Sequence, residues 1–319
     1  MVTLSKLAKL AHVSVSTVSK AFSMSPEVNE QTREQIFNLA RELGCFKKYY
    51  KAQYPKLVIA VLCPEFKSRL YSQSLSVLQE HFSRHNCEIC VASTEFSEEK
   101  ERELMAYYNR HTSVDGIVVI GSNGQPDPDL EIPVAYVGGK NPGCFRVDLN
   151  LQPAAEQAVE YFISHGVTDI GFVSEPHTER KLRIFQEQLA QQGYPVPPHR
   201  IAVSEKRFEA GGYEAMERLL SADVPPRAVI CGYDYMAIGA IRCIYDRGLS
   251  VPEDIAVLGM DNLYEAKYLN PPLSSLDYPI DRACTLAAEA LLAELMGQPH
   301  SRWEEVEAIL HLRRSTEME

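Results

Sequence analysis

Residues 2–44 read VTLSKLAKLAHVSVSTVSKAFSMSPEVNEQTREQIFNLARELG, and this stretch decides how the N-terminal part of the chain folds. Thr3 is placed to cap a first helix whose leucines and alanines share one face. Ser14 is placed to cap a second helix, VSTVSKAF, and Asn29 precedes a third helix that stops at Gly44. Three short helices, with small alanines where the first two must cross closely, predict an all-α helix-turn-helix headpiece.

The charge of the chain is unevenly distributed. Residues 1–56 hold nine Lys/Arg and four Asp/Glu, which gives +5, whereas the remaining 23 basic and 39 acidic residues give −16, so that the total is −11. Local basic charge on an acidic body suits a small DNA-binding module whose carrier repels non-specific contact with polyanions.

From Leu57 onward, short apolar runs alternate with amphipathic stretches. The runs LVIAVLC, CEICVAS, GIVVI, PVAYV, DIGFVS, AVICG and IAVLG predict strands, and helices are expected over 70–85, 98–111, 152–165, 179–192, 211–221, 234–247 and 281–296. This alternation predicts doubly wound α/β layers, in which parallel sheets carry helices on both faces. About ten strands over some 260 residues favour two such lobes over one.

No catalytic constellation stands out in the sequence. Gly121-Ser122-Asn123-Gly124 lacks the Lys-Ser/Thr of a P-loop, and the nine histidines show no metal-ligand spacing. Alternation along a strand places Cys87 and Cys90 on opposite faces, which favours buried reduced thiols over a metal or redox pair. We therefore expect no enzyme, no metal and no cofactor. Because the sequence shows neither an 18-residue apolar run nor an apolar leader, we expect a cytoplasmic protein without a membrane partner.

The segments HVSVSTVSK and VNEQTRE resemble the headpiece of the lactose-repressor/galactose-repressor (LacI/GalR) family of bacterial transcriptional regulators. The core adds VDGIVVIG, EYFISHGVTDIGFVS, YDYMAIGAIRCIYDRGLSVPEDIAVLGMDN, PPLSSLDYP and LRRST in the expected order. The resemblance implies a homodimer with lobes like those of periplasmic binding proteins and an effector held in the cleft between them. It implies a headpiece at 1–46, a basic hinge or linker at 47–56, an N-terminal lobe at 57–165 and 279–307, and a C-terminal lobe at 166–278 and 308–319.

Matching the family motif residue by residue places Val15, Ser16 and Lys20 where the recognition helix reads base edges in the major groove. A Val exposed at the start of a polar helix face suits a thymine methyl group, and Lys20 suits guanine O6/N7. The residues expected to contact phosphates are Thr3, Ser14, Thr17, Ser19, Asn29 and Thr32. The alternative for Ser14 is a role as a cap only, and the alternative for Val15 is an ordinary surface position.

The predicted hinge departs from the family pattern. Tyr54 stands in place of the leucine that wedges into the minor groove, and Lys51 stands in place of an alanine. Aromatic residues can partly unstack a base step, and the lysines of residues 47–56 can hold phosphates. Whether this hinge folds as a helix and kinks DNA stays open.

Effector contacts are expected just after the apolar runs, because ligands meet parallel sheets at the C-terminal ends of their strands. The resemblance adds Lys181, with Arg180 and Arg183 close enough to substitute; the alternative for this trio is a solvated basic face. Asp234 could instead be only a helix N-cap. The full set of expected effector residues is Ser68, Tyr71, Lys181, Arg183, Tyr233, Asp234 and Asp261, the last followed by Asn262.

The sequence thus predicts a dimeric repressor that binds a near-palindromic DNA operator and is switched by a small molecule, with a sugar or glycoside as the leading class. Tyr233 stands where the family commonly has Asn, and Asn150 where it commonly has Asp, so the ligand's identity stays open. The alternatives are a sugar phosphate or a nucleoside or purine as effector, action as an activator, and, more remotely, a solute-binding receptor.

Overall fold

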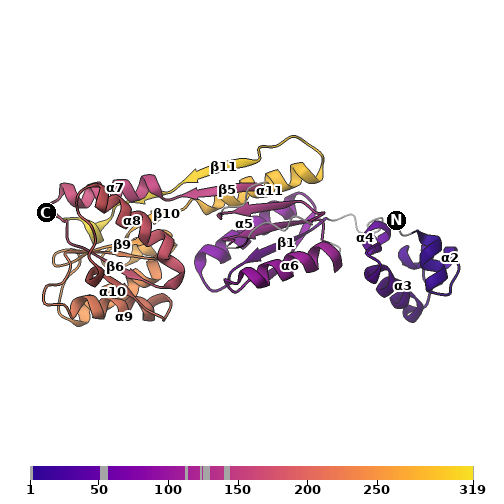
Figure 1. Cartoon of the computed structure of the whole chain (residues 1–319), viewed down its shortest axis with the longest axis horizontal. Coiled ribbons are helices and arrows are strands. Elements are labelled where there is room, and N and C mark those ends of the chain that lie inside the picture. The colour runs from indigo at the N-terminus through magenta and orange to yellow at the C-terminus, as the bar shows by residue number, and fades with distance from the viewer. Residues whose placement is uncertain are drawn as a thin grey trace. The chain divides into compact units, whose positions relative to one another are not determined.

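The computed structural model describes residues 3–50, 57–111, 114–122, 124, 130–139 and 144–318 (Figure 1). The chain divides into two compact units. Unit 1 comprises residues 1–148 and 280–304 and contains the helical headpiece and a first sheet; unit 2 comprises residues 149–279 and 305–319 and contains a second sheet. Among the described residues, no helix is both long and apolar enough to cross a membrane.

The headpiece is a helix-turn-helix, as predicted. Its three main helices are α1 (Leu4–Leu10), α2 (Val15–Phe22) and α3 (Glu30–Glu42). Leu7, Val18, Ile36 and Ala40 are fully buried, one or two from each helix, so the three amphipathic faces share one small core. The helix α3 is followed by Gly44 in a left-handed conformation (φ 63°), the backbone geometry that ends many helices.

A fourth helix, α4 (Phe46–Tyr50), corrects the predicted linker at 47–56. Its aromatic rings pack on the headpiece: Phe46 lies 5.1 Å from Phe37 and 5.9 Å from Phe22, and Tyr49 lies 5.6 Å from Phe22. Tyr50 stacks on Phe46 at 4.5 Å and meets Phe37 edge-on at 5.2 Å. Positions 46, 49 and 50 have helical spacing, so this segment has an apolar face and belongs to the headpiece at least as far as residue 50.

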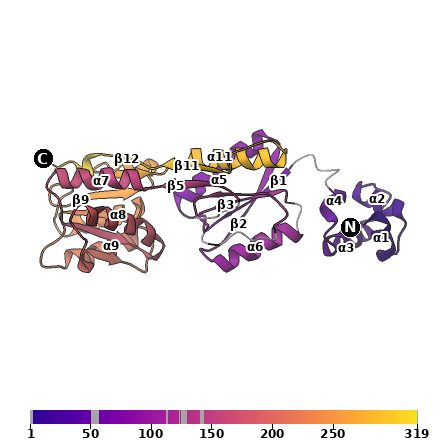
Figure 2. The ribbon, with the colours of Figure 1, turned by 45° about the horizontal axis from the view of Figure 1, so that its top comes forward.

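The sheet of unit 1 has six strands in the order β11-β5-β4-β3-β1-β2. Helices α5 and α11 cover one face of this sheet and α6 covers the other (Figure 2). The strands are β1 (Leu57–Cys63), β2 (Cys87–Ser93), β3 (Gly116–Ile120), β4 (Val134–Val137), β5 (Phe145–Asn150) and β11 (Trp303–Glu307), and the helices are α5 (Arg69–Arg84), α6 (Glu98–His111) and α11 (Ile280–Leu295).

The sheet of unit 2 has the order β12-β10-β9-β8-β6-β7 and is parallel except for β12, which runs antiparallel to β10. Helices α7 and α8 pack on one face of it and α9 and α10 on the other. The strands are β6 (Ile170–Ser174), β7 (Ile201–Val203), β8 (Ala228–Cys231), β9 (Ala256–Met260), β10 (Ser274–Asp277) and β12 (Ile309–His311), and the helices are α7 (Gln152–Ser164), α8 (Glu179–Gln191), α9 (Phe208–Leu220) and α10 (Asp234–Asp246). The predicted fold class, a helical headpiece with two doubly wound α/β lobes, is confirmed.

One lobe boundary differs from the prediction. The N-terminal lobe was expected to run to residue 165, but residues 149–165 belong to unit 2. The reason is the apolar face of α7, on which Ala155, Ala158 and Phe162 are buried in one core with Phe172 and Phe185 of unit 2. The two crossings near residue 279 and residue 304 fall within a few positions of the expected ones.

Candidate DNA-binding and effector sites

Helix α2, the predicted recognition helix, begins at a hydrogen-bonded cap and presents polar residues to solvent. The Ser14 hydroxyl accepts the backbone N–H of Thr17 at 3.0 Å and bonds the Thr17 hydroxyl at 2.8 Å. Val15 is 45% exposed and Ser16 is exposed, whereas Val18 is fully buried. Two of the three residues predicted to read bases therefore share the solvent-facing side of α2, and their contact with DNA stays a prediction.

Five of the six side chains predicted to hold phosphates lie at helix N-termini; the sixth, Ser19, is exposed in the middle of α2. Thr3 accepts the N–H of Lys6 at 3.3 Å, and Asn29 accepts the N–H of Thr32 at 2.8 Å, so each caps its helix as Ser14 does. Capping fixes each first turn and leaves its other N–H groups pointing outward, where a phosphate oxygen binds favourably. For Ser14, capping and phosphate contact are compatible roles.

The third predicted base reader, Lys20, has an acidic partner that the sequence did not reveal. Its ammonium group forms an ion pair with Glu27, which lies in the turn between α2 and α3. Lys51 and Tyr54, the predicted minor-groove residues, lie outside the described part of the chain.

The carboxyl edge of the second sheet brings together Lys181 and Asp261. The Lys181 ammonium donates to the carboxylate of Asp261 at 3.0 Å and to the carbonyl oxygen of Gly232 at 3.1 Å, and it lies 5.5 Å from the centre of the Tyr278 ring. Burial lowers the pKa of Lys181, but the charge and hydrogen bond of Asp261, together with the other acidic groups nearby, outweigh this effect and hold the pKa above its usual value. The two side chains remain partly accessible, at 22% and 13%.

Asp261 occupies an unusual backbone conformation. It has a φ of 89° and the following Asn262 a φ of 44°, two left-handed non-glycine residues in succession directly after β9. Backbone strain of this kind persists only where the surroundings hold it, and it is concentrated at functional sites. Here the N–H of Asp261 donates to the Leu276 carbonyl at 2.7 Å, and the N–H of Asn262 donates to the Ser275 hydroxyl at 3.0 Å. The strained turn is thereby tied to β10.

Tyr233 and Asp234 were expected to contact an effector, but both are turned inward. The Tyr233 hydroxyl accepts the N–H of Phe208 at 3.0 Å, and burial raises its pKa to about 12. Asp234 is 1% exposed; its carboxylate accepts the N–H of Leu263 at 2.8 Å and the hydroxyl of Ser275 at 2.7 Å. Burial raises the pKa of Asp234 to about 8 against these hydrogen bonds. Asp234 thus holds the loop after Asp261, whereas Tyr233 holds the start of α9. Asp234 is the first residue of α10, and Tyr233 occupies its N-cap position.

Of the three basic residues on α8, one lies beside Asp261 and two face solvent. Arg183 donates to Glu179 at 2.7 Å with a side chain that is 62% exposed, and Arg180 is exposed. Of the three, Lys181 is the one that meets Asp261.

Two further charged residues, which the sequence alone did not point to, lie at the same carboxyl edge of the second sheet. Glu175 follows β6 and is 2% exposed, and Arg207, the N-cap residue of α9, lies 3.5 Å from its carboxylate. The rule that selected Asp261, a polar residue directly after an apolar run, also selects Glu175.

In unit 1, Ser68 and Tyr71 lie at the start of α5. Ser68 is the N-cap residue, but its hydroxyl is shielded from solvent and makes no hydrogen bond to any residue of the described chain. The Tyr71 ring meets Phe96 edge-on at 6.5 Å, and its hydroxyl approaches Gly121, which follows β3 with a φ of 64°. Both residues therefore lie near the carboxyl ends of the strands of the first sheet, as expected from their places in the sequence.

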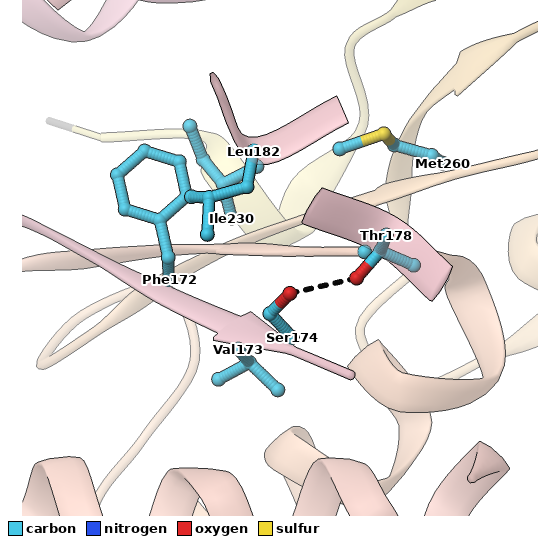
Figure 3. A pocket seen from close by; sticks show the side chains of 8 residues that line it. Phe172, Val173, Ser174, Thr178, Leu182, Ile230 and Met260 are labelled. Atoms are coloured by element: carbon cyan, nitrogen blue, oxygen red, sulfur yellow. Dashed lines mark hydrogen bonds between the residues drawn. The ribbon is translucent and has the colours of Figure 1, made fainter. Parts of the chain in front are cut away.

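A small cavity lies within unit 2 beside the start of α8. Its volume of about 10 Å³ matches roughly one water molecule. Figure 3 shows the hydrogen bond between the Ser174 and Thr178 hydroxyls, 2.7 Å long, beside apolar side chains of the lining. The cavity is lined by Phe172, Val173, Ser174, Thr178, Leu182, Ile230, Gly232 and Met260. This space is too small for an effector. Within the described ranges, no group of three or more His, Cys, Asp or Glu residues is placed to hold a metal ion.

Comparisons with known proteins cover both the headpiece and the α/β core. Residues 3–46 match the model of bacterial regulatory proteins of the lacI family, and residues 159–316 match that of the periplasmic binding protein-like domain. The chain is 28% identical over 324 residues to the "Probable HTH-type transcriptional repressor ExuR" of Bacillus subtilis (strain 168), covering 96% of this chain and 95% of the relative.

A second relative and a solved structure extend the likeness to the whole chain. The HTH-type transcriptional repressor CytR of Escherichia coli (strain K12) is 26% identical over 322 residues, covering 93% of this chain and 90% of the relative. A complex of the transcriptional regulator CelR with cellobiose has the same fold, with a TM-score of 0.69 and 24% identity over 99% of this chain and 100% of that one.

A helix-turn-helix headpiece joined to two α/β lobes defines a DNA-binding transcriptional regulator with a ligand-binding core. The chain combines the helix-turn-helix domain of the lacI family of bacterial regulatory proteins with a periplasmic binding protein-like domain, and the relatives that it matches along its length are transcriptional repressors.

Proposed function

We propose that the protein is a homodimeric repressor that binds a near-palindromic operator and releases it when a neutral sugar or glycoside binds at the Lys181–Asp261 pair. The observation that carries the proposal is this partly accessible ion pair, held by a strained turn at the carboxyl edge of the second sheet. The repressor names of the relatives and the cellobiose bound by the similar structure support it.

The chemistry of the pair favours a ligand hydroxyl. Two of the three N–H donors of Lys181 are engaged by Asp261 and Gly232, which leaves one donor for a ligand. The second carboxylate oxygen of Asp261 accepts from a hydroxyl, so adjacent hydroxyls of a sugar satisfy both groups. Because Asp261 neutralises Lys181, a phosphate gains less from this pair than from an unpaired lysine. A nucleoside, whose ribose also carries adjacent hydroxyls, is the second candidate.

The dimer follows from how few base pairs one headpiece reads. Two headpieces related by a two-fold axis read two half-sites of a near-palindrome, which supplies the affinity and specificity that one lacks. Repression by release requires that effector and DNA favour different states of the core, with a coupling of about 1–3 kcal/mol, or roughly 5- to 150-fold in affinity.

The test uses the full-length protein, an operator selected from random DNA, and a panel of sugars, glycosides, nucleosides and sugar phosphates. We expect one neutral sugar or glycoside to weaken operator binding by roughly 5- to 150-fold, measured by fluorescence anisotropy. The Asp261→Ala variant should bind the operator and no longer respond. Asp223→Ala, which removes an exposed carboxylate from a turn of the same unit, is the matched control and should respond normally.

Undiminished effector binding by Asp261→Ala in calorimetry would refute the role of the pair. A response only to sugar phosphates would refute the neutral-ligand class. Light scattering measures the mass in solution, and a monomer on a single unrepeated half-site would contradict the dimer. Transcription in vitro from a promoter that carries the operator decides between repression and activation.

A further inference from the structure

An acidic residue stands beside the recognition helix, where DNA phosphates would repel it. Lys20 lies in the last turn of α2, and its ammonium group is bound by the carboxylate of Glu27, two residues before the N-cap of α3. Both side chains face solvent, with 43% and 66% of their surfaces exposed. The pair is therefore on the surface of the headpiece and not in its core.

The turn that carries Glu27 is held firmly on both sides. The N–H of Ser25 donates to the carbonyl of Lys20 at 3.0 Å, and the N–H of Val28 donates to the carbonyl of Ser25 at 3.2 Å. From α3, the guanidinium of Arg33 donates to the carbonyls of Ser25 and Val28, each at 2.8 Å. Val28 itself is 5% exposed. The backbone around Glu27 is thus anchored to both helices, and its side chain projects beside α2.

Stability does not explain this arrangement. An ion pair between exposed side chains contributes little to folding, and a carboxylate near the DNA backbone weakens binding. Base recognition would account for it. In the major groove cytosine presents the N4 amino donor, which a glutamate accepts, and guanine presents O6 and N7, which a lysine approaches as a donor. A Lys–Glu pair is therefore complementary to a G·C base pair or to neighbouring G and C bases.

We propose that Glu27 is a specificity-determining residue that accepts a hydrogen bond from cytosine N4, while the adjacent Lys20 donates to guanine. This inference rests on the proposed function, since it requires the headpiece to bind DNA in the major groove. On binding, Glu27 exchanges its contact with Lys20 for one with cytosine, and Lys20 exchanges Glu27 for guanine. Both charged groups therefore keep a hydrogen-bond partner.

The experiment selects binding sites from random DNA with the full-length wild type and the variants Glu27→Gln, Glu27→Ala and Glu34→Gln. We expect the wild type to prefer cytosine at one position of each half-site. The guanine that Lys20 contacts is either the pairing partner of this cytosine or a base next to it. Glu27→Gln should shift this position toward adenine, because glutamine pairs with adenine N6 and N7. Glu27→Ala should lose the preference, which amounts to roughly 5- to 150-fold in relative affinity.

Glu34→Gln removes the same charge from an exposed position within α3 and serves as the control, so it should select the wild-type sequence. The inference is overturned if both Glu27 variants select the wild-type consensus and only gain affinity uniformly, because Glu27 would then act as an electrostatic brake on Lys20. That result leaves the regulator intact. A wild type that selects no consensus at all overturns the proposed function together with the inference. Because Glu27→Gln preserves the shape of the side chain, its result stands even if Glu27→Ala disturbs the turn.

Discussion

Replacement of Phe46 by alanine tests whether α4 is a structural part of the headpiece. The Phe46 ring is 7% exposed and stacks on Tyr50 at 4.5 Å. It meets the edge of Phe37 at 5.1 Å, and the guanidinium of Arg41 lies 4.7 Å from its centre. Without this ring, the short helix α4 has lost its main anchor, so we expect α4 to unfold and the core formed by α1, α2 and α3 to loosen.

The expected size of the effect follows from burial. Truncation of a buried phenylalanine to alanine typically costs about 3–5 kcal/mol. A headpiece of about 50 residues, at 0.05–0.15 kcal/mol per residue, has a total stability of only about 2.5–7.5 kcal/mol. These two ranges overlap, so a substantial fraction of the Phe46→Ala headpiece should be unfolded at 25 °C. Phe46→Leu, which retains most of the apolar volume, should cost much less.

Hydrogen exchange read by mass spectrometry separates the headpiece from the rest of unit 1. We expect faster exchange in peptides from residues 4–42 of Phe46→Ala and a loss of operator affinity. The single tryptophan, Trp303, lies in β11, so its fluorescence reports the sheet of unit 1, whose unfolding midpoint should stay unchanged. Phe66→Ala, at a position that is 46% exposed, is the control. Wild-type exchange and wild-type operator affinity in Phe46→Ala would refute the assignment of α4 to the headpiece.

Three further substitutions probe the other claims. Lys20→Ala should relax base preference at one position of each half-site at a cost of about 1–3 kcal/mol, and a DNA selection that shows an unchanged preference would reject this. Asp234 has a pKa raised by burial from 3.8 to about 8, so the folded state keeps its proton to higher pH than the unfolded chain. The stability that this proton confers is present below about pH 4 and is lost as the pH rises through 8. Asp234→Asn should flatten this decline of the free energy of unfolding with pH, measured by denaturant titration. A decline as steep as that of the wild type would show that Asp234 is not its origin. Gly212→Ala places a Cβ 2.0 Å from the carbonyl oxygen of Met236, where α9 meets α10. This substitution should destabilise unit 2 by about 3 kcal/mol or more. A melting temperature equal to that of the wild type would show that the two helices can separate to admit the methyl group.

The elements that could be predicted from the sequence are those with strong local patterns. Helix α6 lies over the predicted residues 98–111, and Thr3, Ser14 and Asn29 all cap helices as expected. Helix α4 was missed because five residues are too few to show a period, and because its apolar face is completed by Phe22 and Phe37 from other helices. Sequence patterns report a residue's neighbours along the chain, whereas these contacts join residues that are far apart in it.

The same limit governs the candidate effector site. Asp234 and Asp261 both follow an apolar strand, and the sequence rule treats them alike, yet their side chains have opposite roles. Asp261 adopts a left-handed backbone that leaves its carboxylate partly accessible beside Lys181. Asp234 begins α10, and its carboxylate lies where Gly259 of β9 would carry a side chain, since a Cβ there would be 2.1 Å from the Asp234 oxygen. The absence of a side chain at Gly259 thus leaves room for the buried carboxyl group of Asp234. This group accepts hydrogen bonds from Leu263 and Ser275 and so fixes the loop after Asp261. The buried Asp234 therefore helps to hold the accessible Asp261 in place, and this arrangement depends on the absence of a side chain at Gly259, 25 residues beyond Asp234.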